Sequence, residues 1–202
     1  MSARSKARSK VQKKKGFGRG EKIIAVIIVL VVIWAAYSFS QPSQPTTTTT
    51  QASTVTTSTS GVPDFALPIV GPNGLTGQTV SMSSFRGKVV LLEFMVPWCG
   101  HCQNMAPVLE SLYQQFGPQN VVFLTVSGSW QGASASDAAK FIRDYRSSWI
   151  YAYDSSNSVF NLYGVNQTPT FFIIGKNGSV AGTYQGEVPI ETLAADLTRI
   201  NS

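Results

Sequence analysis

The chain has 202 residues, of which 43% are hydrophobic, and this size suits one folded domain with attached segments. Its formal net charge of +6 is unevenly distributed: residues 1–22 contain nine Lys or Arg and one acid, whereas residues 61–202 contain seven basic and nine acidic residues. The basic character therefore belongs to the N-terminal tail. This distribution argues against a folded domain that binds nucleic acid through a basic surface.

Residues 23–39 are predicted to form a transmembrane helix. They carry no charge, and ten of the first eleven are Ile, Val or Leu. A helix of this length spans roughly 25 Å, slightly less than the ~30 Å hydrocarbon core of a bilayer. The positive tail at 1–22 predicts a cytoplasmic N-terminus, with the rest of the chain outside the membrane. A cleaved signal peptide, with small-residue sites at Ala35-Ala36 or Ser38-Phe39-Ser40, is the alternative.

Residues 40–60 are predicted to form a flexible stalk. Thirteen of the twenty residues from 41 to 60 are Ser or Thr, and such a segment buries too little apolar surface to fold. A coil of this length has a root-mean-square span of about 25 Å. The stalk would let a tethered domain reach proteins at or above the membrane.

A folded domain is predicted to begin near Gly61 and to end at residue 202. Short apolar runs between turn residues predict β-strands at 65–70, 78–81, 89–95, 121–126, 151–153, 170–174 and 179–184. Apolar residues at helical spacing predict helices from the cysteine pair to residue 116, at 138–145 (capped by Ser134 or Ser136), at 156–163 and at 190–197. This order has a parallel half and an antiparallel hairpin half, which indicates an α/β sandwich.

The only two cysteines, Cys99 and Cys102, lie where the strand at 89–95 gives way to a helix, and the only histidine, His101, lies between them. Cysteines three apart on a helix share a face, close enough for a disulfide after a small adjustment. The helix N-terminus stabilises a thiolate at Cys99, whereas Cys102 is shielded. The pattern predicts a nucleophile with its resolving partner.

Two other interpretations of the cysteine pair are weaker. A zinc half-site needs two further ligands, and the chain contains no other Cys or His to supply them. A purely structural disulfide of this short span would close almost no loop and would stabilise little.

Around the cysteines the sequence resembles the active site of the thioredoxin-fold family. Pro107 matches the proline inside the family's active-site helix, and Glu93 takes the place of its buried aspartate. Thr168-Pro169-Thr170 matches the family's loop with a cis proline. The segments 63–68 and 85–90 resemble the membrane-tethered TlpA/ResA-like branch, which is related to the peroxiredoxins. The resemblance implies a thioredoxin-like three-layer α/β sandwich with a mixed central sheet.

The resemblance also implies roles for residues near the dithiol. Burial in an apolar strand would raise the pKa of Glu93, so that it exchanges protons with Cys102; a solvated Glu93 at an exposed edge is the alternative. His101 departs from the branch, which usually has proline there, and Cys-Gly-His-Cys is similar to protein disulfide isomerase. As an imidazolium, His101 would stabilise the Cys99 thiolate and make the disulfide a stronger oxidant; a solvent-facing bystander is the alternative.

The substrate is expected to bind beside the dithiol. A cis Pro169 would expose the backbone of Thr168, which could then pair with an extended substrate peptide. Trp98 and Gly186 are expected to line the same face, with simple packing as the alternative for Trp98.

The sequence thus predicts a membrane-anchored, extracytoplasmic thiol–disulfide oxidoreductase that acts on exported protein thiols and disulfides, without metal, flavin or nucleotide. The tether resembles that of reductases that keep cytochrome c or other exported thiols reduced, and a reductase would need a membrane partner that delivers electrons. His101 instead favours an oxidase or isomerase. A thiol peroxidase would need a Thr-x-x-Cys spacing, and a copper chaperone a CxxxC motif with a distant His; the sequence has neither. These two, with a non-catalytic binding module, are the alternatives.

Overall fold

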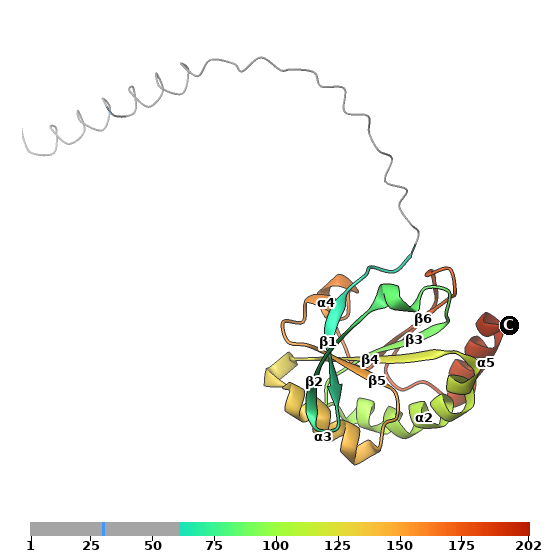
Figure 1. Cartoon of the computed structure of the whole chain (residues 1–202), viewed down its shortest axis with the longest axis horizontal. Coiled ribbons are helices and arrows are strands. Elements are labelled where there is room, and N and C mark those ends of the chain that lie inside the picture. The colour runs from blue at the N-terminus through green and yellow to red at the C-terminus, as the bar shows by residue number, and fades with distance from the viewer. Residues whose placement is uncertain (1–29, 31–60) are drawn as a thin grey trace, which may run out of the picture. The chain divides into compact units, whose positions relative to one another are not determined.

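The computed structural model describes Leu30 and residues 61–202 (Figure 1). Across these described residues, no helix has both the length and the apolar character needed to cross a membrane. The basic tail (1–22), the membrane segment (23–39) and the stalk (40–60) lie, except for Leu30, outside the described residues. They therefore stay predictions from the sequence.

Residues 61–202 contain one mixed sheet of seven strands, in the order β2-β1-β5-β4-β3-β6-β7 (Figure 1). The strands are β1 (Ala66–Gly71), β2 (Gly74–Ser81), β3 (Val90–Met95), β4 (Val122–Gly128), β5 (Ile150–Asp154), β6 (Thr170–Ile174) and β7 (Val180–Gln185). The main helices are α2 (Gly100–Phe116), α3 (Ala135–Tyr145), α4 (Ser158–Leu162) and α5 (Ile190–Asn201).

The connections between strands decide which face each helix covers. Strands β3, β4 and β5 are mutually parallel, and α2 and α3 connect them in the same direction across the sheet. Right-handed crossovers therefore place both helices on one face, where α5 also packs. The connection from β5 to β6 contains α4, and its Val159 and Phe160 pack in the core on the opposite face. The result is the expected three-layer sandwich.

Strand β3 is buried along its whole length because helices cover both faces of the sheet. Its side chains alternate between the faces: Leu91 and Met95 pack in the core beneath α2, whereas Leu92 and Phe94 pack in the core on the α4 side. This alternation puts Glu93 on the α2 face, beneath the helix that carries the cysteines.

The predicted elements agree with the structure, apart from their ends. Ser134, one of two predicted caps, begins α3 with a capping box in which it pairs with Asp137. The strand predicted at 151–153 is the interior strand β5, because the N-terminal hairpin joins the sheet beside it. Pro107 lies inside α2 as predicted.

Candidate active site

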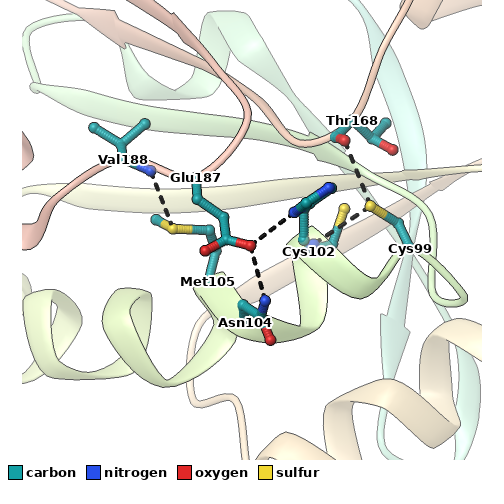
Figure 2. Close-up of polar contacts among 8 residues, drawn as sticks. Cys99, Cys102, Asn104, Met105, Thr168, Glu187 and Val188 are labelled. Atoms are coloured by element: carbon teal, nitrogen blue, oxygen red, sulfur yellow. Dashed lines mark hydrogen bonds and ion pairs between the residues drawn. The ribbon is translucent and has the colours of Figure 1, made fainter.

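Cys99 and Cys102 occupy the first turn of α2 and have different surroundings (Figure 2). Cys99 is the N-cap: its Sγ accepts a hydrogen bond from the backbone N–H of Cys102 at 3.3 Å, and its thiol donates to the carbonyl oxygen of Thr168 at 3.4 Å. Cys99 is 8% exposed, whereas Cys102 is fully buried. Both are free thiols. Only Cys99 therefore has an edge open to solvent.

The surroundings of Cys102 oppose its ionisation. Burial raises the pKa of the Cys102 thiol far above its ordinary value, and the nearby Glu93 carboxylate and the Cys99 sulfur raise it further. Cys102 thus stays protonated until a base removes its proton. The arrangement can support sequential chemistry, in which Cys99 reacts first and Cys102 second.

Glu93 is the buried acid beneath the dithiol. It is 4% exposed, which excludes the exposed-edge alternative. Thr125, its neighbour in β4, donates a hydrogen bond from Oγ1 to Glu93 Oε2 at 2.7 Å, and Trp149 Nε1 donates to Thr125 Oγ1 at 2.8 Å. Burial raises the pKa of Glu93 to about 7, although the bond from Thr125 opposes part of this rise. Glu93 can therefore gain or lose a proton near neutral pH.

The loop before β6 lies directly beside Cys99. Its Thr168-Pro169 peptide bond is cis, as predicted, and the Thr168 carbonyl contacts the Cys99 thiol. A second loop supports it, because the N–H of Gly186 donates to the Pro169 carbonyl at 2.8 Å. Gly186 has φ +78°, in the left-handed region that favours glycine. Thr168, Pro169 and Gly186 thus form one connected edge of the site.

Trp98 is the neighbour of Cys99 in the chain. Its side chain is exposed, and its Nε1 donates a hydrogen bond to the carbonyl of Trp130 at 3.2 Å. It borders a cavity of about 330 Å³ between the active-site turn and α3, whose lining includes Pro97, Gln103, Phe141 and Tyr145. Trp98 therefore contributes surface beside the dithiol as well as packing.

His101 faces away from the core and has a carboxylate partner. Its Nδ1 lies 2.7 Å from Glu187 Oε1, and Asn104 Nδ2 donates to the same oxygen at 2.8 Å (Figure 2). The hydrogen bonds of Cys99 go instead to Thr168 and Cys102. Any effect of His101 on Cys99 must therefore act through space and in the presence of Glu187.

Four residues of this site were missed in the sequence: Thr125, Trp149, Glu187 and Asn104. The sequence pattern could have indicated Thr125, because Glu93 and Thr125 are the single polar residues of the predicted strands 89–95 and 121–126, which neighbour each other in such a fold. No local sequence pattern indicates Glu187, since 86 positions separate it from His101. For metals, the described part of the chain has no group of three His, Cys, Asp or Glu side chains placed to hold an ion.

The fold and the paired thiols on α2 define a thioredoxin-fold thiol–disulfide oxidoreductase. A model of the AhpC/TSA family matches residues 59–183, more than half of the chain. The thiol-disulfide oxidoreductase ResA of Geobacillus thermodenitrificans is 31% identical over 141 residues, which are 70% of this chain and 76% of that protein.

Solved structures agree with this assignment. A Chlorobium tepidum protein described as a thiol:disulfide interchange protein, DsbE, has a TM-score of 0.63 and 29% identity, covering 70% of this chain and 96% of its own. The exposed lipoprotein thioredoxin Etrx1 of Streptococcus pneumoniae has a TM-score of 0.57 and 26% identity, covering 68% and 99%. The chain belongs to the AhpC/TSA family, as a TlpA/ResA-like thiol–disulfide oxidoreductase, and is an enzyme of that class.

Proposed function

We propose that Cys99 exchanges disulfides with exported proteins and that Cys102 resolves the intermediate. In the reducing direction, the Cys99 thiolate attacks one sulfur of a substrate disulfide, and the second substrate sulfur leaves as a thiolate. Cys102 then loses its proton and attacks Cys99, which releases the substrate dithiol and leaves a Cys99–Cys102 disulfide. The observation that carries this proposal is the asymmetry of the pair, with an accessible N-cap thiol and a buried partner.

We further propose that Glu93 takes the proton that Cys102 must lose. Its pKa of about 7 makes a carboxylate available at neutral pH, and its charge already acts on the Cys102 thiol. Thr168, Pro169, Trp98 and Gly186 would hold an extended substrate segment over Cys99.

Trapping tests the roles of the two thiols. Cys102→Ser should accumulate mixed disulfides with substrate proteins, whereas Cys99→Ser should form none. Limiting iodoacetamide at pH 6 should label Cys99 before Cys102 in the reduced wild-type domain. Preferential labelling of Cys102, or mixed disulfides trapped by Cys99→Ser alone, would reverse the assignment.

We propose that residues 23–39 anchor the chain in the membrane, with the tail 1–22 in the cytoplasm, the stalk 40–60 outside and the catalytic domain extracytoplasmic. The charge pattern of the sequence supports this arrangement. Protease added to intact cells or spheroplasts should digest the domain. Digestion only after lysis would contradict the orientation, and a mature chain that begins after Ala36 or Ser40 would show a cleaved signal peptide instead.

We also propose that the physiological direction is reduction, with electrons supplied by a membrane partner. The tether supports this direction, and so does the Glu187 carboxylate that accompanies His101. Equilibration of the domain with glutathione buffers should give a potential below that of glutathione, in the range of thioredoxin at about −270 mV. A potential near −180 mV or higher, as in isomerases and oxidases, would contradict it.

A further inference from the structure

The exchange proposed for Cys99 does not explain how His101, inside the CxxC motif, affects the redox potential of the Cys99–Cys102 pair. We propose that Glu187 is a positioning residue: it holds the His101 imidazole away from the Cys99 sulfur and offsets the charge that the ring carries when it is protonated. The dithiol is thereby kept more reducing than the same motif would be with a free histidine. The inference rests on the proposed function, and the experiments below test the two separately.

The first observation is that the Glu187 carboxylate contacts two side chains of α2. Oε1 of Glu187 lies 2.7 Å from His101 Nδ1 and accepts a hydrogen bond from Asn104 Nδ2 at 2.8 Å. His101 and Asn104 are three apart on α2, so one carboxylate oxygen meets both side chains on a single face of the helix. The bond to His101 also lowers the pKa of Glu187, which keeps the carboxylate charged.

The second observation is where Glu187 and Thr168 lie relative to the first turn of α2. Figure 2 shows Glu187 over Asn104 and Met105, whereas Thr168 lies on the other side of the helix turn, next to Cys99. The imidazole therefore has its partner in Glu187, while the Cys99 sulfur has its own partners in Thr168 and the Cys102 N–H.

The backbone is anchored on both sides of Glu187, whereas an ordinary surface ion pair joins two mobile side chains. The N–H of Gly186 donates to the Pro169 carbonyl at 2.8 Å, and the N–H of Val188 donates to Met105 Sδ at 3.4 Å. Val188 itself is buried in the core beneath α2. Because the backbone is anchored to both the cis-proline loop and α2, the Glu187 carboxylate is held in one position beside His101.

The electrostatic consequence follows from the sum of charges. An imidazolium alone near Cys99 would stabilise the thiolate of the reduced form and make the disulfide a stronger oxidant. The carboxylate beside it offsets that charge, and its hydrogen bond with Nδ1 competes with any contact between the ring and the sulfur. Both groups are largely exposed, so we expect a modest effect that solvent screens in part.

The test measures redox equilibrium with glutathione for the wild-type domain, Glu187→Gln, His101→Asn and the double variant. Glutamine keeps the shape and an acceptor oxygen but removes the charge. We expect Glu187→Gln to favour the dithiol by about two- to fivefold, which corresponds to a potential about 10 to 20 mV more positive. Glu191→Gln is the matched control: Glu191 is an exposed carboxylate at the start of α5, and its removal should change the constant much less.

The double variant shows whether Glu187 acts by positioning His101 or only through its own charge. If Glu187 acts through His101, its substitution should have less than half the effect in the His101→Asn background. An equal effect in both backgrounds would show that Glu187 acts only as a charge, and no effect in the wild-type background would remove its role altogether. Either result overturns the inference.

The histidine itself gives an independent readout. His101 is the only histidine in the chain, so ¹H–¹⁵N spectra of its ring contain a single set of signals. In the wild type these should show a proton on Nδ1 in the hydrogen bond to Glu187, and Glu187→Gln should shift the Nδ1 signals because the charged acceptor is lost; an unchanged ring spectrum would contradict the contact. Failure of the proposed exchange would appear differently, as a wild-type Cys99–Cys102 pair that does not equilibrate with glutathione at all.

Discussion

Two carboxylates flank the same dithiol in opposite environments. Glu93 lies beneath it in the core, where burial raises its pKa to about 7. Glu187 lies on the rim, where His101 and Asn104 lower its pKa. The residue type is the same, so the contrast shows that surroundings decide the role: a buried carboxylate becomes a proton carrier near neutral pH, and an exposed one stays charged.

The contrast also concerns how far each charge acts. The Glu93 carboxylate reaches Cys102 through the protein interior, and its charge raises the pKa of that thiol. The pair formed by Glu187 and His101 is in contact with water, which screens its field. We therefore expect variants at Glu93 to have large effects that resist salt, and variants at Glu187 to have small effects that salt reduces.

The largest expected effect is on stability. The pKa of Glu93 is near 4.5 in the unfolded chain and about 7 in the folded one, so between these values the folded protein binds the proton that the unfolded chain has released. Stability due to this group is fully present below pH 4.5 and is lost as pH rises to about 7, by about 3 kcal/mol in total. Urea denaturation should show this fall for the wild type and a flatter profile for Glu93→Gln. Parallel profiles would show that Glu93 does not carry the proton.

The second effect is on rate. Glu93→Gln should slow the resolution of a mixed disulfide by Cys102 by about 10²-fold at neutral pH, because the buried thiol loses its base. The initial attack by Cys99 should change little. Stopped-flow measurement with a peptide disulfide separates the two steps, with Glu191→Gln as the control. Equal slowing of both steps would indicate a general disturbance of the site rather than a lost proton carrier.

A smaller effect tests the hydrogen bond to Glu93. Thr125→Val removes the donor that lowers the pKa of Glu93, so its titration should move upward from about 7. We expect a shift of roughly 0.5 to 1 pH unit, measured from the pH profile of the resolution rate or by carboxyl NMR. Thr125→Ser keeps the hydroxyl and should titrate like the wild type. A downward shift in Thr125→Val would contradict the sign of the interaction.

The smallest expected effect is that of salt, which should act on the exposed Glu187 but hardly on the buried Glu93. Raising the salt concentration from 0.1 to 1 M shortens the screening length from about 10 Å to about 3 Å. The difference in potential between wild type and Glu187→Gln should shrink by about half or more, whereas the titration of Glu93 should stay nearly constant. A salt-sensitive Glu93 titration would mean that water reaches that carboxylate and that the two carboxylates do not differ in their exposure to solvent.

Much of the domain could be predicted because its signals are local. The apolar runs of β3 and β4, the cap at Ser134 and the placement of the cysteines at a helix start depend on neighbours within one or two turns. The cis bond before Pro169 came instead from the family resemblance, which no local propensity supplies.

The sequence by itself therefore determined the class of protein: a strand, a CxxC pair and a helix, in a chain whose alternating elements build a mixed sheet. Only the tertiary structure decided the electrostatics of the site. It placed Thr125 and Trp149 in a hydrogen-bond chain to Glu93, and it brought Glu187 to His101 from 86 positions further along the chain. The physical reason is that a charge's environment is set by the groups that surround it in space, and here these come from β4, the residue before β5 and the loop after β7, far along the chain from the cysteines.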